Sequence, residues 1–407
     1  MYTSTPALGF VIAALLAGAA VHTGYHMLPS VQLADASKAC IGDENNNASH
    51  IDCWYDLIHD TFTESGLQSA MRAFMYIYET QPEFASTGCH RHAHRVGDAV
   101  YYEQYVPVQS LDAINFPQET TACGYGFFHG FIEHLIQDHP TSEFITDTCQ
   151  HLTDRLADRM GDIRITCYHG AGHGLMLAQA EMVSRSEWGQ VLSFVQVPLL
   201  QCEALPEANE SEIEECKEGV FNILVDWMEI DDYGFTYDTE SPFAVCDQFK
   251  QKHQKACYYE MAQKIAGLVS DSDPVEIAEF ISSVESDELR KMSFTVAVAG
   301  VMQSVAALGP DGYMPVLERC VLLSDDLLGA CLRSVANGLF EHGSPQEEYK
   351  EAVGFCHSPI VQATSVSEVC WRTVGAKLYR FYPSNKREDI CRSFPLVYRH
   401  YCNDKYD

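Results

Sequence analysis

"CGYGFFHGFIEHLI" (residues 123–136) is an apolar segment that begins at a cysteine and carries small residues near its start. Its apolar positions recur with the period of about 3.6 residues that is typical of an amphipathic helix. The same arrangement returns in four later stretches, at 216–228 (CKEGVFNILVDWM), 257–269 (CYYEMAQKIAGLV), 331–340 (CLRSVANGLF) and 370–382 (CWRTVGAKLYRFY). A cysteine followed by a helix is therefore a repeated unit of this chain.

The spacing of these cysteines predicts the fold class. Successive units begin at Cys53, Cys89, Cys123, Cys167, Cys216, Cys257, Cys331, Cys370 and Cys402. The steps are 32 to 49 residues long, except for one step of 74 in which Ser293 stands where a cysteine is missing. Stretches between them, such as 273–284 and 311–323, supply a second helix per unit. We therefore expect an all-α fold of helical-hairpin repeats, similar to an α-solenoid and either open or strongly curved.

The cysteines also predict a disulfide framework. The chain has 16 of them, and seven of the eight sequential pairs are 11 to 18 residues apart, while the eighth, Cys89 and Cys123, is 34 residues apart. No C-x-x-C motif occurs, so neither a zinc ribbon nor a thioredoxin-type redox pair is indicated. Disulfides of this density are typical of an oxidising compartment. The remaining expected pairs are Cys40–Cys53, Cys149–Cys167, Cys202–Cys216, Cys246–Cys257, Cys320–Cys331, Cys356–Cys370 and Cys391–Cys402.

The amino terminus indicates export. Residues 1–28 hold an apolar core and a cluster of small residues at 17–20 that resembles a cleavage site, but no Lys or Arg. We interpret this segment as a signal peptide, or as a membrane anchor through residues 7–28. Both alternatives place the rest of the chain in a secreted, periplasmic or extracellular location. A linker is expected at 29–50, followed by His-rich repeats at 51–200 and structural repeats at 201–407 that continue them.

Charge limits the class of partner. The chain has 26 Lys and Arg against 57 Asp and Glu, which gives a formal net charge of −31. A field of this sign repels DNA and RNA, so no nucleic-acid partner is expected. A protein partner remains open, as does the oligomeric state.

Histidines concentrate in the first repeats, where nine of the 17 fall between His90 and His173. Residues four apart lie on one face of a helix, so three pairs of metal-ligand residues are expected on consecutive units. Imidazole and carboxylate are common ligands of transition metals, here Fe, Zn or Cu. The nearby glycines predict a close approach of the helices or of a ligand to the backbone. The candidate ligands are His90, His94, His129, Glu133, His169 and His173.

Several alternatives to a metal site are compatible with the sequence. The histidines can cap helices and pack beside glycine without a metal, in which case the chain is a non-catalytic scaffold for a protein partner. His92, His134, His139 and His151 are expected to lie on the surface or to support the ligands. The H-E-x-x-H motif of zinc proteases is absent, because Arg91 follows His90 and Gly170 follows His169. No catalytic residue is therefore predicted.

In architecture alone, the pattern is similar to that of helical-repeat di-iron hydroxylases, in which His and Glu of successive repeats hold two metals. Those enzymes use adjacent His-Glu pairs, which this chain lacks. The sequence thus predicts an exported metal-binding protein, either a mono- or dinuclear metalloenzyme of oxygen or hydrolytic chemistry or a protein that sequesters metal.

Overall fold

A computed structural model describes Ser37, Cys40 and residues 47–160, 163–269, 273–343 and 347–403. The chain divides into two compact units, unit 1 (1–74) and unit 2 (75–407). The predicted signal peptide or anchor at 1–28, and most of the linker at 29–50, lie outside the described residues. Within the described ranges, no helix combines the length and the apolar character needed to span a membrane.

Unit 1 consists of α3 (Asn47–Ser65) and the first part of α4 (Leu67–Thr80). Gly66 separates the two helices and adopts a φ of +80°, a left-handed conformation that a residue with a Cβ seldom adopts. The predicted disulfide joins Cys40 to Cys53 of α3, and the indole of Trp54 donates a hydrogen bond of 3.2 Å to the carbonyl of Ser37. These contacts tie the segment that precedes α3 to that helix.

Unit 2 contains the repeats, and its described part includes no strand, so the predicted all-α class is confirmed. Its longer helices are α5 (Pro82–Val100), α7 (Ala122–Asp138), α8 (Ser142–Met160), α9 (Arg164–Met182), α10 (Val191–Glu203), α11 (Glu210–Glu229), α12 (Gln251–Ala262), α14 (Asp287–Val305), α15 (Pro310–Cys320), α16 (Asp325–His342), α17 (Glu348–His357) and α19 (Ser367–Phe381). Shorter helices are α6 (Val106–Val108), α13 (Pro274–Phe280), α18 (Pro359–Gln362), α20 (Ser384–Cys391) and the 3₁₀ helix η11 (Leu396–Asn403).

Turn residues and caps set the starts of these helices. Proline occupies the first helical position of α5 and α13. An N–H group at this position has no partner within the helix, so proline can occupy it without loss of a hydrogen bond. The Asp273 side chain caps α13 by accepting a hydrogen bond of 2.8 Å from the Val275 amide. Asn209 and Glu212 form a reciprocal capping box at the start of α11, with hydrogen bonds of 2.9 and 3.0 Å.

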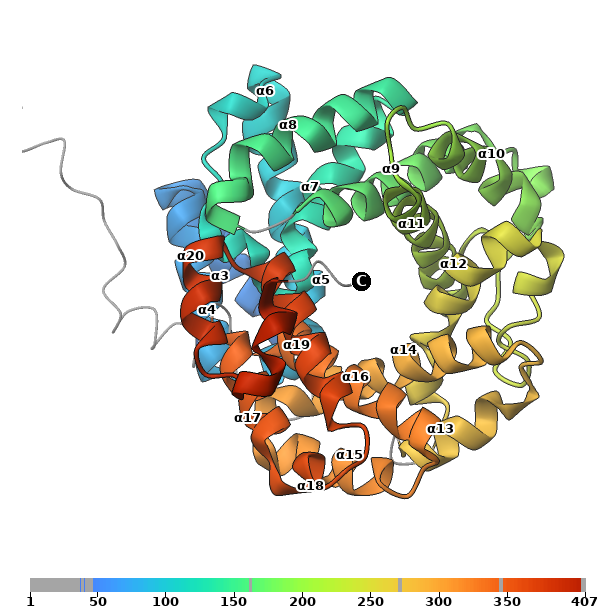
Figure 1. Ribbon diagram of the computed structural model, residues 1–407. Helices are drawn as coiled ribbons and strands as arrows, with labels where there is room; N and C mark the ends of the chain where they lie inside the picture. The colour runs from blue at the N-terminus through green and yellow to red at the C-terminus, as the bar shows by residue number, and fades with distance from the viewer. Residues whose placement is uncertain are drawn as a thin grey trace, which may run out of the picture. The chain divides into compact units, whose positions relative to one another are not determined.

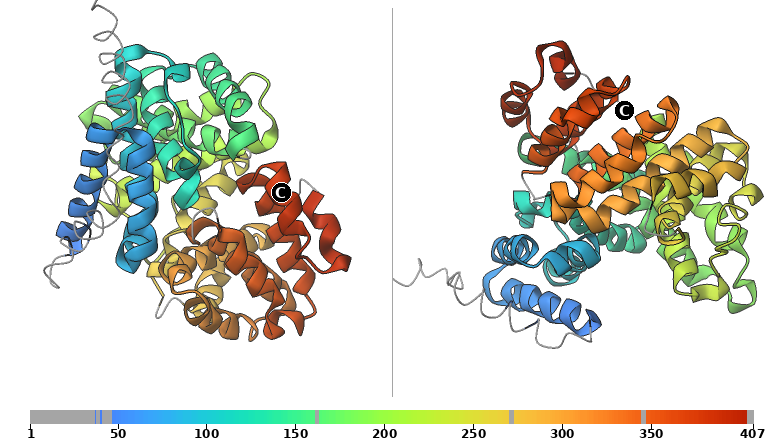
Figure 2. Two further views of the ribbon diagram at one scale, coloured as in Figure 1. Left: turned by 90° about the vertical axis from the view of Figure 1, so that its left-hand side faces the viewer. Right: turned by 90° about the horizontal axis from the view of Figure 1, so that it is seen from below.

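The helices of unit 2 form two layers. The inner helices, α5, α7, α9, α11, α12, α14, α16 and α19, contact one another in chain order, and α8, α10, α13, α15 and α17 lie outside them (Figure 1). Figure 2 shows the pairs following one another in the order of the chain. The inner layer also returns on itself, because α14 contacts α5 and α16 contacts α7. Tyr125 on α7 donates a hydrogen bond of 2.9 Å to the Arg380 carbonyl on α19. The repeats of unit 2 therefore take the strongly curved form.

The eight predicted disulfides are all present, and no described cysteine is free. Cys320 and Cys356 lie at the ends of the outer helices α15 and α17 and bond to Cys331 of α16 and Cys370 of α19. The expectation that a repeat cysteine begins its helix is wrong for Cys89, Cys216 and Cys257, which lie six or seven residues after the starts of α5, α11 and α12. The framework points to an oxidising, extracytoplasmic environment.

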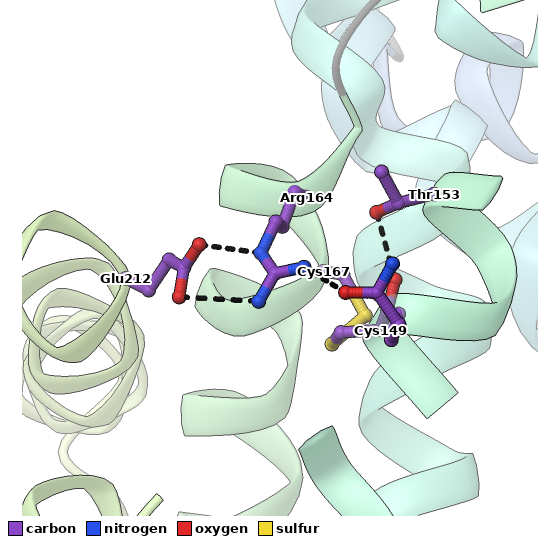
Figure 3. Close-up of a disulfide and its surroundings, with 6 residues drawn as sticks. Cys149, Thr153, Arg164, Cys167 and Glu212 are labelled. Atoms are coloured by element: carbon purple, nitrogen blue, oxygen red, sulfur yellow. Dashed lines mark hydrogen bonds and ion pairs between the residues drawn. A yellow bond between two sulfur atoms is a disulfide. The ribbon is translucent and has the colours of Figure 1, made fainter. Parts of the chain in front are cut away.

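The first turn of α9 is held from two sides (Figure 3). The disulfide Cys149–Cys167 joins it to α8, and Arg164 forms an ion pair with Glu212 in the first turn of α11. A second guanidinium nitrogen of Arg164 lies 3.5 Å from the other Glu212 oxygen. Because α9 carries His169 and His173, these bonds help to define where both side chains lie.

Glycines allow the inner helices to pack backbone against backbone. An added Cβ would overlap a main-chain carbonyl of a neighbouring inner helix at Gly97, Gly130, Gly172 and Gly219. The close approach of helices expected from the glycines is thus confirmed between α5 and α7 and between α9 and α11. The contacts also bring the side chains that flank these glycines close to the neighbouring helix.

Replacing Gly97 by alanine is expected to lower the free energy of unfolding by about 1–3 kcal/mol, because the new Cβ would overlap the Phe127 carbonyl and lie 2.7 Å from the Phe131 amide nitrogen. Gly354 in α17 is the matched control, since nothing lies within 4 Å of its added Cβ. Gly354→Ala should be neutral or stabilising by up to about 1 kcal/mol. Urea unfolding followed by circular dichroism measures both changes, and equal stabilities would contradict the packing argument.

Candidate metal centre

The six predicted ligand residues come from three consecutive inner helices, two from each helix. His90 and His94 lie on α5, His129 and Glu133 on α7, and His169 and His173 on α9. Their imidazole rings form a continuous group. The ring centroids are 4.9 Å apart for His90–His129, His129–His169 and His169–His173, 5.5 Å for His129–His173 and 6.3 Å for His94–His173.

Glu133 lies between two of these histidines. Its Oε2 atom is 3.0 Å from His94 Nε2 and 3.2 Å from His173 Nδ1. The three residues offer one donor atom each within 4.8 Å of one another. His173 Nε2 is buried and has no hydrogen-bond partner within the described part of the chain. Two imidazoles and one carboxylate are a donor set that binds Fe(II) or Zn²⁺.

His90, His129 and His169 form the rest of the group, and His169 also lies near α11. His90 Nδ1 lies 2.9 Å from the Cys123 carbonyl, so this nitrogen carries the proton and Nε2 is left as an acceptor. That Nε2 atom is 3.1 Å from His129 Nδ1. His169 Nδ1 lies 3.7 Å from a Glu215 oxygen. Each of the three histidines is therefore oriented by a neighbour.

Asp98 and His134 surround the group on one side. Asp98 Oδ1 is 3.4 Å from His94 Nδ1 and 3.5 Å from His134 Nε2, and His134 Nε2 lies 3.8 Å from Glu133 Oε1. His134 therefore lies beside the candidate ligands, which is one of the two positions expected for it. A carboxylate on the far nitrogen of a ligand histidine sets the orientation of its ring.

The other three histidines lie away from the group. His92 corrects the expectation of a surface or supporting position, because it is fully buried and stacks on Phe84 with a centroid distance of 4.3 Å. Two residues along a helix turn the side chain by about 200°, so His92 points away from the face that carries His90 and His94. His139 and His151 are exposed, as expected.

The environment keeps most of these imidazoles neutral. Burial, together with the neighbouring His94, lowers the pKa of His90 to about 3. Burial and the surrounding histidines also lower the pKa of His129 and of His173. His94 differs: burial opposes its charge, but Glu133 and Asp98 raise its pKa to about 10. Because metals bind neutral imidazole, the cluster is largely prepared for a metal at neutral pH.

Glu133 is the anionic member of the group. Burial would raise the pKa of its carboxyl, but His94 and His173 lower that pKa to about 2. The carboxylate is therefore ionised across the physiological range and is available as a ligand without loss of a proton.

Two further acidic residues near His169 were not predicted. One donor atom each of His169, Glu218 on α11 and Glu260 on α12 lies within 4.8 Å of the others. A signal for Glu218 was present in the sequence, since it follows Cys216 by two residues as His169 follows Cys167. Glu260 follows Cys257 by three residues and has no such equivalent.

Comparison with protein-family models, with curated protein sequences and with solved structures gives no match to this chain.

Proposed function

We propose that this chain is an exported metal-binding protein whose centre consists of His90, His94, His129, Glu133, His169 and His173. The observation that carries the proposal is the convergence of three i,i+4 pairs, from three consecutive inner helices, on one group of touching side chains. Iron, zinc and copper are the metals that suit imidazole ligands. The location is proposed to be secreted, periplasmic or extracellular, because eight disulfides require an oxidising compartment.

The number of ligands favours two ions over one. Six candidate ligands exceed the four that a tetrahedral ion needs. In the two-ion form, one ion would be held by Glu133 with His94 and His173, whose nearest nitrogens lie 3.0 and 3.2 Å from Glu133 Oε2, and the other by His129 with His90 and His169, whose rings lie 4.9 Å from its own. A metal with open coordination positions supplies activated water or oxygen. The enzymatic form of the proposal is a metalloenzyme of oxygen or hydrolytic chemistry.

Burial favours a second candidate function, metal sequestration without catalysis. His129, Glu133 and His173 are 8%, 6% and 3% exposed, so a large substrate cannot reach them without movement of the helices. A buried centre of this kind holds an ion more readily than it admits a bulky reactant. Turnover assays of the metal-loaded protein with small oxygen-dependent and hydrolytic substrates separate the two functions.

Elemental analysis of the purified protein tests the metal centre. We expect one or two transition-metal ions per chain after dialysis, and a loss of at least one ion in His129→Ala, because the His129 ring contacts those of His90 and His169. His151→Gln is the control, since His151 is exposed on α8 and its Nε2 lies 3.0 Å from Asp112 Oδ1, away from the candidate ligands. Metal-free wild type, or unchanged metal content in His129→Ala, would refute the centre.

Metal affinity is expected to rise with pH by about tenfold per unit between pH 6 and 9. Without metal, His94 carries a proton in this range because Glu133 and Asp98 raise its pKa to about 10, and that proton must leave before the ring can bind. His90, with a pKa of about 3, is already neutral and adds nothing to the slope. Competition titrations of Zn²⁺ at pH 6, 7 and 8 measure the slope, and a flat profile would exclude His94 as a ligand.

A further inference from the structure

The acidic residues beside His169 form a group of their own on α9, α11 and α12. Glu260 is fully buried and Glu218 is 8% exposed, although both carry carboxyl groups. Neither forms an ion pair with a Lys or Arg side chain of the described ranges. Lys217, the lysine of α11, instead lies 3.4 Å from Glu214 and 3.3 Å from the Lys252 carbonyl. Burial of unpaired carboxylates is costly unless a cation or a proton compensates them.

Glu260 is held in one orientation with one oxygen left bare. Its Oε2 atom accepts hydrogen bonds of 2.6 Å from Asn222 Nδ2 and of 2.6 Å from Gln263 Nε2. Its Oε1 atom is buried and has no hydrogen-bond partner in the described part of the chain. Buried polar atoms are rarely left without a partner. A carboxylate fixed by two amides, with its second oxygen unpaired, has the arrangement of a ligand supported by its surroundings.

The repeat explains how these groups meet. Asn222 and Gln263 both stand six residues after a repeat cysteine, the place that His129 occupies after Cys123. In the repeats of α11 and α12, the residue at this place is thus an amide that orients a carboxylate, where α7 has an imidazole. Glu218 stands at the place of His169 and points a second carboxylate toward the same group.

We infer that His169, Glu218 and Glu260 form a second metal site, which binds a divalent transition cation that accepts mixed nitrogen and oxygen ligands, such as Mn²⁺, Fe²⁺ or Zn²⁺. Two carboxylates match the double charge of the cation, and one imidazole completes three protein ligands. Glu215, 3.7 Å from His169 Nδ1, is placed to orient that ring. The two sites have His169 in common; because its Nδ1 faces Glu215, its Nε2 can bind only one ion at a time, and the centre proposed above retains its five other ligands when His169 binds the second site. The repeats beyond residue 201 therefore bind metal as well.

Mn²⁺ binding to the metal-depleted full chain tests this site, with electron paramagnetic resonance reporting free and bound ion. We expect Glu260→Gln to bind one ion fewer than wild type and to retain the ion that depends on Glu133. Glu133→Gln should show the reverse pattern, so the two sites can be told apart. Glu229→Gln is the control, because Glu229 lies on the same helix as Glu218 but is exposed and pairs with Lys264 at 2.7 Å. It should bind as wild type does.

Glu218→Gln provides a second, independent variant should Glu260→Gln fail to fold, and it should lose the same ion. If Glu218→Gln and Glu260→Gln each bind as many ions as wild type, the second site is overturned and the first is unaffected. If Glu260→Gln lowers the number of bound ions and Glu133→Gln does not, the result would support the second site and overturn the proposed centre. Wild type that binds no Mn²⁺ or Zn²⁺ would overturn both.

Discussion

Replacing Glu133 by glutamine is expected to weaken Zn²⁺ binding to the proposed centre by at least about 100-fold, more than the 10- to 100-fold typical of a supporting residue. Glu133 is the anionic member of the six, and its Oε2 contacts His94 at 3.0 Å and His173 at 3.2 Å. Glutamine keeps the shape of the side chain but removes the charge. Competition against a chromophoric chelator at constant pH measures the change.

Glu143→Gln is the matched control for this experiment, because Glu143 is an exposed glutamate on α8. Its affinity for Zn²⁺ should equal that of wild type. The variant Glu133→Gln should also return the pKa of His94 toward its ordinary value, since Glu133 is the first of the groups that raise it. Wild-type affinity in Glu133→Gln would remove this carboxylate from the centre.

Removal of the disulfide Cys89–Cys123, by serine at both positions, is expected to lower the free energy of unfolding by about 4 kcal/mol. The two cysteines are 34 residues apart, and a loop of this length gains considerable entropy in the unfolded chain when it is no longer closed. The bond joins α5 to α7 and is the pair with the longest separation. Urea unfolding of oxidised wild type and of the double variant measures the difference.

The same variant should also weaken metal binding, which a purely structural disulfide remote from the centre would not do. Cys123, Gly124 and Tyr125 all have left-handed backbone, with φ of 56°, 63° and 64°, and this turn presents the Cys123 carbonyl to His90 Nδ1 at 2.9 Å. The double serine variant of Cys391 and Cys402 is the control. Its pair is 11 residues apart at the end of unit 2, so it should cost about 3 kcal/mol and leave metal affinity unchanged. Equal metal affinity in the two double variants would show that the turn at Cys123 does not affect metal binding.

Local spacing was sufficient to predict the class of fold and the pairing of cysteines. Each short pair closes one loop between neighbouring helices, so only sequence distance decides which cysteines meet. The i,i+4 pairs are local in the same sense, because one helical turn places His169 and His173 on one face whatever surrounds them. The glycines beside the histidines predicted close packing, which is confirmed at Gly130, where an added Cβ would lie 2.2 Å from the His94 carbonyl oxygen.

A contact between two helices could be predicted only where both residues stand at equivalent positions of the repeat. The second group of ligands shows this limit, since Glu260 becomes a candidate only because α12 brings it to Glu218 and His169, and Asn222 turns its carboxylate. The burial of His92 was open for a similar reason, because the sequence does not say whether the face of α5 opposite His90 and His94 packs against other helices, and His92 is buried there beside Phe84 of the same helix.

The sequence by itself therefore determined the repeat, the disulfides and which residues share a helix face, all of which depend on short distances along the chain. Only the tertiary structure decided how the inner layer of unit 2 closes, which face of each helix meets the next, and which carboxylates reach His169. These features depend on packing between residues that are far apart in sequence, where small differences in crossing angle and side-chain volume choose the neighbours.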